Sequence, residues 1–375
     1  MKQNNAFDVI VIGGGLAGLT TALHLSQNGV EVCLIEKKHY PRHKVCGEYV
    51  GNEVLPYLNS LQINPFQFGA KKVESFQITD KKGKNIETKL PLGGFGISRY
   101  TFDNVLYEAI KDKVHVVFET VVDVSCDNEK GVVQTQNKKT FQAPIVVGAF
   151  GKRSNLDTFL KRKFIQKKSP WLAVKNHFEY DFPEDTVALH NFHGGYCGLS
   201  KTETDVVNAC YLTTFSSFKK WGNVADFQTN VLSENPYLNT FYKHAAPIFD
   251  KPLTISQISF DRKKPVENHI FMIGDSAGLI HPLCGNGMAM AIMSAKLFSD
   301  LYLKMKTDGM DRAQLENKYT TVWNNEFASR LKAGRYIQKA LIHPFASKVG
   351  FAIGRAFPST ISKVIAKTHG KPHML

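Results

Sequence analysis

The glycines and acidic residue between positions 13 and 36 have the spacing needed to bind a dinucleotide. Gly13, Gly15 and Gly18 form a Gly-x-Gly-x-x-Gly motif after the apolar run at 7–12, and Glu36 follows 18 residues after the last glycine. In such a motif the first glycine allows a tight turn, the second lets the backbone approach a pyrophosphate, and the third lets helix and strand pack closely. A carboxylate at Glu36 suits a ribose with both hydroxyls free, which favours an adenosine dinucleotide without a 2′-phosphate at this site.

A second glycine-containing motif, near the other end of the chain, also follows an apolar run and could also bind a ligand. Gly274 and Asp275 end another apolar run, and the loop that follows contains Gly285 and Gly287. A carboxylate at the C-terminal end of a buried parallel strand lies where such sheets bind ligands. A helix is predicted over 287–304, and the free N–H groups of its first turn would favour an electron-rich group.

These motifs require a parallel sheet with helices packed against it. Residues 7–12 and 30–35 are almost wholly apolar and rich in β-branched side chains, as expected of strands buried on both faces. Residues 19–26 between them have helical spacing, and Asn28 with Gly29 ends that helix. The segment is therefore a complete βαβ unit.

Together the motifs resemble those of a large FAD-dependent family that includes geranylgeranyl reductases and aromatic-ring hydroxylases of the p-hydroxybenzoate hydroxylase type. The resemblance covers nearly the whole chain and implies FAD as cofactor, with NADH or NADPH as a transient reductant. In this family the aspartate that matches Asp275 binds the ribityl chain. The segment that matches 282–288 lies against the isoalloxazine ring, with backbone N–H groups facing its N1/O2 edge.

Three further segments fit the same family. Residues 40–48 resemble the proline–lysine–Cys-Gly segment that passes beside the flavin in geranylgeranyl reductases, although residues 37–44 could also form a solvated basic turn. Arg99 resembles an arginine that reaches the FAD phosphates or ribityl chain, but it could instead pair with Asp103, four residues on. A strand predicted over 117–124 matches the one whose backbone contacts adenine, at Val121. The predicted FAD-binding residues are Gly13, Gly15, Leu16, Ala17, Gly18, Glu36, Lys37, Arg42, Cys46, Gly47, Arg99, Val121, Gly274, Asp275, Pro282, Gly285, Gly287 and Met288.

Two positions depart from the family patterns. Phe150 stands where an aspartate associated with both FAD and NAD(P)H binding is usual, which leaves the route of nicotinamide binding open. Residues 193–200 align with the Gly-Tyr-x-Trp-x-Phe-Pro segment of geranylgeranyl reductases and keep Gly195 and Tyr196, but Gly198 replaces the tryptophan. Unless this segment is only a strand with a Gly-Tyr bulge, the missing ring opens space over the flavin and indicates a substrate other than the usual prenyl chain. The Trp-x-Trp segment of related flavin halogenases is absent from the sequence, which argues against halogenation.

The predicted fold class is α/β, or α+β overall. A Rossmann-type FAD-binding domain is interleaved with a β-sheet substrate domain, and helices follow at the C-terminus. The predicted bounds are 1–71, 96–161 and 262–326 for the FAD-binding domain, 72–95 and 162–261 for the substrate-binding domain, and 327–375 for the basic amphipathic helices. Within the substrate domain, a hairpin is predicted to turn at 80–83.

Two enzymatic reactions are open to such a protein. Reduced FAD could react with oxygen, and a C4a-hydroperoxide would then hydroxylate a hydrophobic aromatic, polyketide or polyene substrate. Reduced FAD could instead reduce a C=C bond, with a side chain supplying the proton. The candidates for acid–base or positioning roles are Cys46, Tyr196 and His281. Each has a structural alternative: Cys46 could only pack against the flavin, Tyr196 could only form part of the pocket wall, and His281 could only form hydrogen bonds within its loop. The missing aromatic segment favours hydroxylation, and an electron-transfer flavoprotein that serves a protein or quinone partner is a third alternative.

The positive charge of the chain is concentrated at its end. The 375 residues contain 47 Lys+Arg and 33 Asp+Glu, a net charge of +14, yet no acidic residue follows Glu326. Nucleic acid is therefore not an expected partner, because the body of the protein is close to neutral. The basic tail could be a solvated face of helices that cap the substrate domain. It could also contact a membrane surface or an acidic carrier protein that delivers a hydrophobic substrate.

The remaining composition favours a cytoplasmic protein, possibly peripheral at the membrane. The six cysteines form neither a CxxC pair nor a regular spacing, which indicates reduced thiols and not a disulfide framework or zinc site. No metal site is predicted, and histidines such as His177 and His190 are expected at the surface or in hydrogen bonds. The uncharged stretches 9–30 and 276–295 are interrupted by glycines and are not convincing membrane spans.

Overall fold

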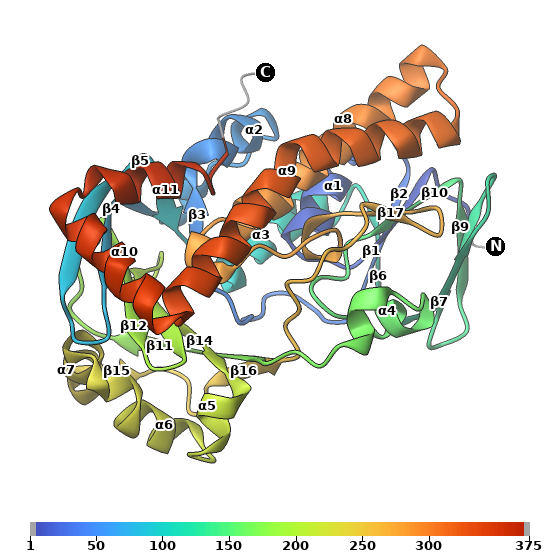
Figure 1. Ribbon diagram of the computed structural model, residues 1–375. Helices are drawn as coiled ribbons and strands as arrows, with labels where there is room; N and C mark the ends of the chain where they lie inside the picture. The colour runs from blue at the N-terminus through green and yellow to red at the C-terminus, as the bar shows by residue number, and fades with distance from the viewer. Residues whose placement is uncertain (1–4, 371–375) are drawn as a thin grey trace.

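The computed structural model of the protein describes residues 5–370 and contains a six-stranded sheet, which lies in the right half of Figure 1. Its strands, from one edge to the other, are β17 (Val266–Glu267), β18 (Ile270–Met272), β10 (Ile145–Gly148), β1 (Val9–Ile12), β2 (Val32–Glu36) and β6 (His115–Phe118). All neighbours pair in parallel except the edge strand β17. Every residue of β1, β2 and β10 is buried, as expected of parallel strands covered on both faces.

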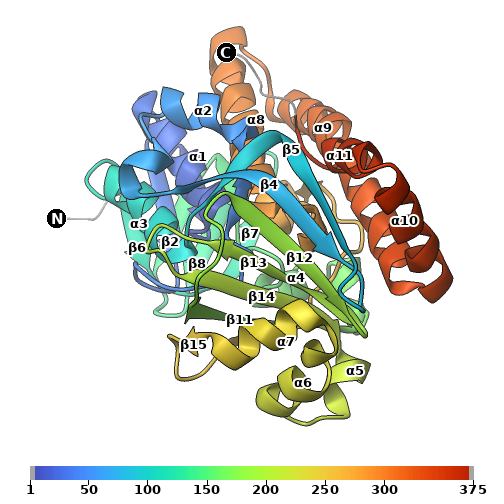
Figure 2. The same cartoon turned by 90° about the vertical axis from the view of Figure 1, so that its left-hand side faces the viewer.

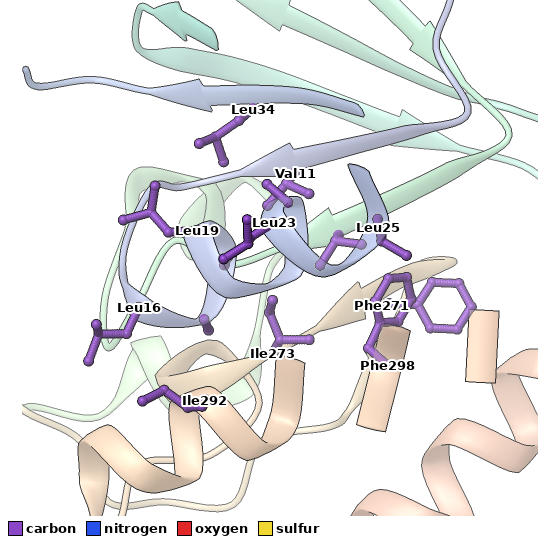
Figure 3. Packing of buried hydrophobic residues seen from close by; sticks show 14 of the residues in the cluster. Val11, Leu16, Leu19, Leu23, Leu25, Leu34, Phe271, Ile273, Ile292 and Phe298 are labelled. Atoms are coloured by element: carbon purple, nitrogen blue, oxygen red, sulfur yellow. The ribbon is translucent and has the colours of Figure 1, made fainter. Parts of the chain in front are cut away.

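The βαβ unit predicted from the first glycine motif is present. Three helices pack together beside the sheet: α1 (Leu16–Gln27), α3 (Arg99–Ile110) and α8 (Gly287–Asp308). Leu23 of α1, Val11 of β1 and Ile292 of α8 belong to one buried core, and Figure 3 shows the strand, the two helices and Phe271 converging on it. Burial of these apolar faces fixes the first turn of α1 against the C-terminal edge of the sheet, where ligands of such folds bind.

A three-stranded antiparallel sheet packs against the same core. It consists of β7 (Val121–Cys126), β8 (Gly131–Thr135) and β9 (Thr140–Ala143). The single strand predicted over 117–124 is therefore wrong, because β6 ends at Phe118 and β7 begins at Val121 in a different sheet. Between them the chain turns, and the carbonyl of Thr120 accepts a 2.8 Å hydrogen bond from the backbone N–H of Gln136.

The strands predicted in the substrate half form a larger, nine-stranded sheet. They are β4 (Lys71–Thr79), β5 (Asn85–Gly96), β11 (Trp171–Glu179), β12 (Thr186–Phe192), β13 (Gly195–Lys201), β14 (Val207–Thr214), β15 (Ala246–Pro247) and β16 (Leu253–Ser256), joined by β3 (Tyr49–Gly51). β4 and β5 form the expected hairpin across residues 80–84. Helices α5 (Phe215–Lys219), α6 (Val224–Asn230) and α7 (Pro236–His244) lie on one side of the sheet, and the C-terminal helices lie on the other (Figure 2).

The C-terminal helices return over the nine-stranded sheet from the part of the molecule that contains the parallel sheet. They are α9 (Arg312–Ile342), α10 (Pro344–Ala356) and α11 (Ser359–Ala366). α9 begins well before the predicted position 327 because Tyr319 and Trp323 are buried in the main core. Phe351 of α10 packs in the core formed by the other face of the large sheet. Sheets, covering helices and the C-terminal helices together confirm the predicted mixed α/β architecture.

Within residues 5–370, no helix has both the length and the hydropathy needed to cross a bilayer.

Candidate functional site

A large cavity lies between the two main sheets and the C-terminal helices. Its volume is about 1400 Å³, which exceeds the roughly 300–1,000 Å³ typical of a pocket for one ligand. The two sequence motifs line one end of it. Apolar side chains from the large sheet and from α9, α10 and α11 line the other. Such a space can hold a dinucleotide and an apolar substrate side by side.

The glycine motif at the nucleotide end is built for close backbone approach. Gly13 has a φ of +108°, and a Cβ there would lie 2.4 Å from the carbonyl oxygen of Ala149. At Gly18 a Cβ would lie 1.9 Å from the carbonyl oxygen of Gly13, so this glycine packs the helix on the strand and does not line the cavity. Gly15 is different, because its position faces open space with only Arg99 Nη2 at 3.8 Å.

The first turn of α1 fits a pyrophosphate. Gly15 is its N-cap and supplies no side-chain acceptor, and the first turn contains no acidic residue. Gly15, Leu16 and Ala17 line the cavity. The N–H groups that a helix leaves unbonded in its first turn are therefore available to an anion here, with the helix dipole in the favourable direction.

Glu36 faces the cavity and also secures the glycine turn. Its Oε2 accepts a 2.8 Å hydrogen bond from the backbone N–H of Gly14. Its Oε1 lies 3.0 Å from Arg42 Nη2, and Tyr40 donates a 2.6 Å hydrogen bond to the Gly14 carbonyl. Arg42 and Lys37 also line the cavity. The arginine predicted to bind the cofactor is thus held by the carboxylate predicted to bind the ribose.

Arg99 pairs with Asp103, and its position is also compatible with the predicted contact to the cofactor. Its guanidinium forms two hydrogen bonds with Asp103, of 2.7 Å from Nε and 2.8 Å from Nη2, and Lys44 Nζ lies 2.7 Å from the same carboxylate. Burial disfavours the charged form, but the pairing with Asp103 raises the pKa of Arg99. The same guanidinium faces Gly15 across the cavity. Asp103 therefore aims a permanent positive charge at the expected phosphate position.

Asp275 lies at the C-terminal end of the sheet and faces the cavity. Its pKa is raised by burial, which Lys152, Lys263 and Arg99 partly oppose. Lys263 donates to the backbone oxygens of Asp275 and Lys152, at 2.7 and 3.0 Å, and burial lowers its pKa to about 8. Among the described residues, no hydrogen bond to the Asp275 carboxylate is found. An oxygen acceptor without a partner fits a hydroxyl-bearing chain such as ribityl.

The loop after Asp275 leads into the bare start of α8. Pro282, Gly285, Gly287 and Met288 line the cavity. The side chain of the N-cap residue Asn286 does not cap the helix. Its Nδ2 instead donates a 2.6 Å hydrogen bond to the carbonyl of Thr368, which follows α11. The first N–H groups of α8 are therefore free to stabilise negative charge on a bound ring.

The backbone of Cys46 and Gly47 is hydrogen-bonded to β14 of the large sheet. Asn208 Nδ2 donates to both of their carbonyl oxygens, at 3.2 and 2.8 Å. Both residues line the cavity, and a Cβ at Gly47 would meet nothing within 4 Å. Cys46 and Gly47 are therefore part of the cavity wall, whereas Lys37 and Lys38, at the start of the predicted basic turn, are exposed.

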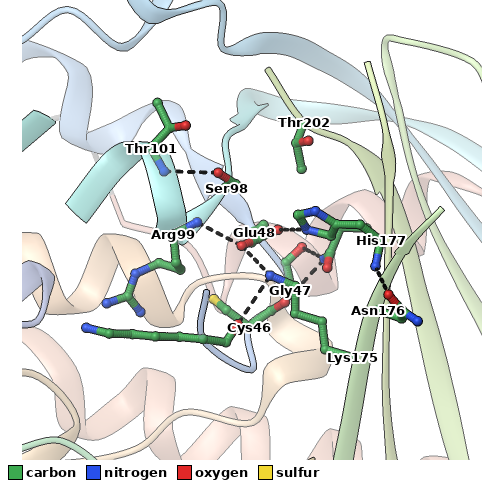
Figure 4. Close-up of polar contacts among 12 residues, drawn as sticks. Cys46, Gly47, Glu48, Ser98, Arg99, Thr101, Lys175, Asn176, His177 and Thr202 are labelled. Atoms are coloured by element: carbon green, nitrogen blue, oxygen red, sulfur yellow. Dashed lines mark hydrogen bonds and ion pairs between the residues drawn. The ribbon is translucent and has the colours of Figure 1, made fainter. Parts of the chain in front are cut away.

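A buried ionic cluster behind this segment was not foreseen. The Glu48 carboxylate accepts hydrogen bonds from Lys175 Nζ at 2.5 Å, His177 Nε2 at 2.7 Å and the Arg99 backbone N–H at 2.7 Å (Figure 4). Glu48 and Lys175 are both fully buried. The only sequence signal was a lysine and a histidine two residues apart in a strand that begins with four apolar residues, a spacing that places both on one face.

The expected catalytic residues separate into two groups. Cys46 and Tyr196 line the cavity, whereas His281 does not. The ring of His281 is stacked on Phe260 with centroids 3.5 Å apart, and burial, with a smaller effect of Arg335, lowers its pKa to about 3. This neutral, packed imidazole lies behind the loop, so its position does not support the expected acid–base role.

Tyr196 and Gly198 form the wall beside the apolar end. Tyr196 is 4% exposed, and burial raises its pKa well above the ordinary value, so the phenol stays protonated. A Cβ at Gly198 would have only ordinary contacts, the nearest 3.7 Å away at the Cys210 carbonyl oxygen. Gly198 therefore leaves open volume where the resemblance expects a tryptophan ring.

Comparisons with known proteins agree with this arrangement. A family model described as FAD dependent oxidoreductase matches residues 8–45, which contain the glycine motif and Glu36. The digeranylgeranylglycerophospholipid reductase of Methanococcus vannielii is 23% identical over 337 residues, covering 86% of this chain and 83% of that protein. The FAD-dependent monooxygenase ntnA of Nectria sp is 24% identical over 353 residues, covering 81% of this chain and 45% of the relative. The chain is an FAD-dependent oxidoreductase. Its fold is also that of the flavin-dependent brominase Bmp2, with a TM-score of 0.77 at 18% identity over 97% of this chain and 93% of that structure.

The residues of this FAD-dependent oxidoreductase fit its cofactor from end to end. All the predicted FAD-binding residues except Gly18 line one cavity. The uncapped start of α1 suits a pyrophosphate, and the unpartnered Asp275 carboxylate suits a polyol. The uncapped start of α8 suits a ring that becomes anionic on reduction. FAD, when bound, supplies the redox chemistry, and the protein supplies orientation and exclusion of water.

Proposed function

We propose that this FAD-dependent oxidoreductase is an NAD(P)H-driven monooxygenase that hydroxylates a hydrophobic aromatic, polyketide or polyene substrate. The observation that carries the proposal is the wall around Gly198, where the cavity continues as an apolar space beyond the flavin-binding residues. Side chains such as Ile78, Leu189, Leu212 and Phe351 form this part. An apolar substrate would gain from the transfer out of water, and the same walls would exclude water from the reaction.

The scarcity of usable proton donors also supports hydroxylation. Reduction of a C=C bond needs a group that delivers a proton to carbon. Tyr196 holds its proton tightly because burial raises its pKa, and the Glu48 carboxylate is occupied by Lys175 and His177. The phenol of Tyr196 is therefore suited to donating a hydrogen bond that orients a substrate oxygen, and less suited to releasing its proton.

Reduction of a C=C bond by an enzyme of the geranylgeranyl reductase type is the second candidate. It is favoured by Cys46 and Gly47, which line the cavity as the resemblance to that branch requires. The similarity to a digeranylgeranylglycerophospholipid reductase gives it independent support. Cys46 would then be the proton donor to test.

Isotope incorporation separates the two reactions. The purified holoprotein is incubated with NADH or NADPH and a panel of hydrophobic aromatic, polyketide and polyene compounds under oxygen-18 gas. A product that carries one oxygen-18 atom and requires oxygen is the expected result. A product that gains two hydrogens, forms without oxygen and contains no oxygen-18 would overturn hydroxylation in favour of reduction. Reduction of an added quinone or acceptor protein with no modified compound would instead identify an electron-transfer flavoprotein.

A further inference from the structure

Helix α10 and the residue after it expose a row of large apolar side chains. Phe345 is 72% exposed, Val349 40%, Ile353 49% and Phe357 64%. They are four residues apart, and a helix places such residues along one face. The opposite face of α10 contains the buried Phe351, which packs under the helix. The helix therefore carries apolar side chains on its exposed face as well as on its buried face.

Basic side chains lie on the same helix and on the next one along the chain. Lys348, Lys363 and Lys367 are exposed and have no ion-pair partner within the part of the chain that the structure describes. No acidic residue follows Glu326 in the sequence. The surface around the row is therefore strongly positive, with nothing of opposite sign on the same helices.

The turn of the β4–β5 hairpin adds to the positive charge. Arg355 Nη1 lies 3.3 Å from Asp80 Oδ2, which places this turn beside α10. The turn also contains Lys81, Lys82 and Lys84. Two separate parts of the chain thus contribute lysines to one surface.

The exposed row borders the cavity. Ile353 and Val364 are 49% and 41% exposed, and both also line the cavity, as does Gly350. α10 and α11 form the outer edge of the molecule on this side (Figures 1 and 2). The mouth of the apolar end of the cavity is therefore framed by the same two helices that carry the row.

We propose that α10 and α11 dock on an anionic lipid surface, with the row from Phe345 to Phe357 inserted at the boundary between headgroups and acyl chains. A helix with exposed aromatic and aliphatic side chains flanked by lysines has the pattern of an interfacial membrane helix. The lysines would be attracted to anionic headgroups. A hydrophobic compound dissolved in the bilayer could then pass between Ile353 and Val364 into the cavity without crossing water.

A lipid surface fits this face better than an acidic carrier protein does. The two phenylalanines, Phe345 and Phe357, are the most exposed large apolar side chains of this segment, at 72% and 64%. A protein partner held mainly by charge would need lysines at the centre of its contact, whereas here the apolar row is central and the lysines flank it. Docking of this kind is independent of whether the enzyme hydroxylates or reduces its substrate.

Vesicle binding tests the apolar row. The full-length holoprotein is mixed with vesicles of phosphatidylcholine alone or of equal parts phosphatidylcholine and phosphatidylglycerol, and the bound fraction is measured by sedimentation. We expect binding to the anionic vesicles, and binding at least about tenfold weaker for Phe345→Ser/Phe357→Ser, because each phenyl ring loses its apolar contact. Phe159→Ser/Phe215→Ser is the matched control, since those rings are each 49% exposed elsewhere on the surface. This control should bind like the unmodified protein.

Substitution of lysines tests the charge. Lys348→Gln, Lys363→Gln and Lys367→Gln should each weaken binding to the anionic vesicles by about fivefold, and added salt should weaken the binding of the unmodified protein. The control substitutions Lys219→Gln, Lys243→Gln and Lys251→Gln on the other side of the large sheet should have no effect. The flavin absorption spectrum reports that each variant keeps its fold and cofactor.

Three results would overturn membrane docking. One is equal sedimentation of the unmodified protein with and without anionic vesicles. Another is equal loss of binding in the row variant and its control. The third is tight binding to a small acidic carrier protein with none to vesicles, which would assign the same surface to a protein partner.

Discussion

The buried cluster around Glu48 leads to a quantitative prediction about the segment beside the flavin. Glu48→Gln removes the charge that compensates Lys175, whose side chain is fully buried. Burial opposes ionisation of Glu48, but Lys175 and His177 hold its pKa below the ordinary value. Leaving one buried charge without its partner costs about 3 to 5 kcal/mol. That is a large part of the roughly 5–15 kcal/mol by which a folded protein is stable.

A double-mutant cycle isolates the interaction. Urea unfolding is measured for Glu48→Gln, Lys175→Met and the double variant. We expect each single variant to lose about 3 to 5 kcal/mol and the double variant to lose clearly less than their sum, because it leaves no buried charge uncompensated. The exposed pair of Lys71 and Asp205, 2.6 Å apart, is the control, and Lys71→Met should cost no more than about 1 kcal/mol.

The same variants connect stability to cofactor binding. Glu48 also fixes the backbone of Arg99, so we expect Glu48→Gln to bind FAD more weakly, measured by flavin fluorescence. Because the pKa of Glu48 is lowered by folding, its stabilisation is present above the unfolded value of about 4.3 and is lost as the pH falls through the folded value. If the double variant loses as much unfolding free energy as the two single variants together, the interaction between Glu48 and Lys175 is refuted.

Three further substitutions test individual parts of the site. His281→Phe should keep FAD binding and turnover. It should also reduce the loss of unfolding free energy as the pH falls from about 6.5 toward 3, because burial lowers the folded pKa of His281 to about 3 and protonation therefore favours the unfolded chain. Loss of turnover with unchanged stability in denaturant titrations would restore an acid–base role. Asp275→Asn should weaken FAD binding by about tenfold or more without destabilising the apoprotein, since a partly desolvated charge is removed; equal FAD affinity by fluorescence titration would contradict its assignment. Gly198→Trp should fold and bind FAD normally but lose turnover of bulky substrates in steady-state assays, because its ring would occupy the open volume; unchanged turnover would show that the substrate lies elsewhere.

The parts of the site that could be predicted from the sequence are those built from neighbouring residues. The glycine motif, Glu36 and the turn at Asp275 depend on spacing within one βαβ unit or one strand–loop–helix, so local patterns were sufficient. Arg99 was assigned two competing roles, and the structure shows them to be compatible, because Asp103 orients the same guanidinium that faces Gly15.

The parts that could not be predicted depend on contacts between distant segments. Glu48 meets Lys175 and His177 across 127 and 129 residues, and no periodicity in either segment indicates the other. The misplaced strand at 117–124 has a related cause. An apolar run shows that a strand is present but not that the chain leaves one sheet for another at Thr120.

The C-terminal helices are an intrinsic part of the site, which their composition alone did not reveal. Helical spacing predicted amphipathic helices, but their inner faces line the cavity and their end is bonded to the flavin loop. Asn286 Nδ2 donates to the carbonyl of Thr368, which is 2% exposed. Asn286 is also the N-cap of α8, whose bare first turn faces the cavity. The residues after α11 therefore help to hold the first turn of α8, which lines the cavity. Exposed lysines lie on the same C-terminal segment, so a contact made by its outer side acts on a part of the chain that also supports the cavity.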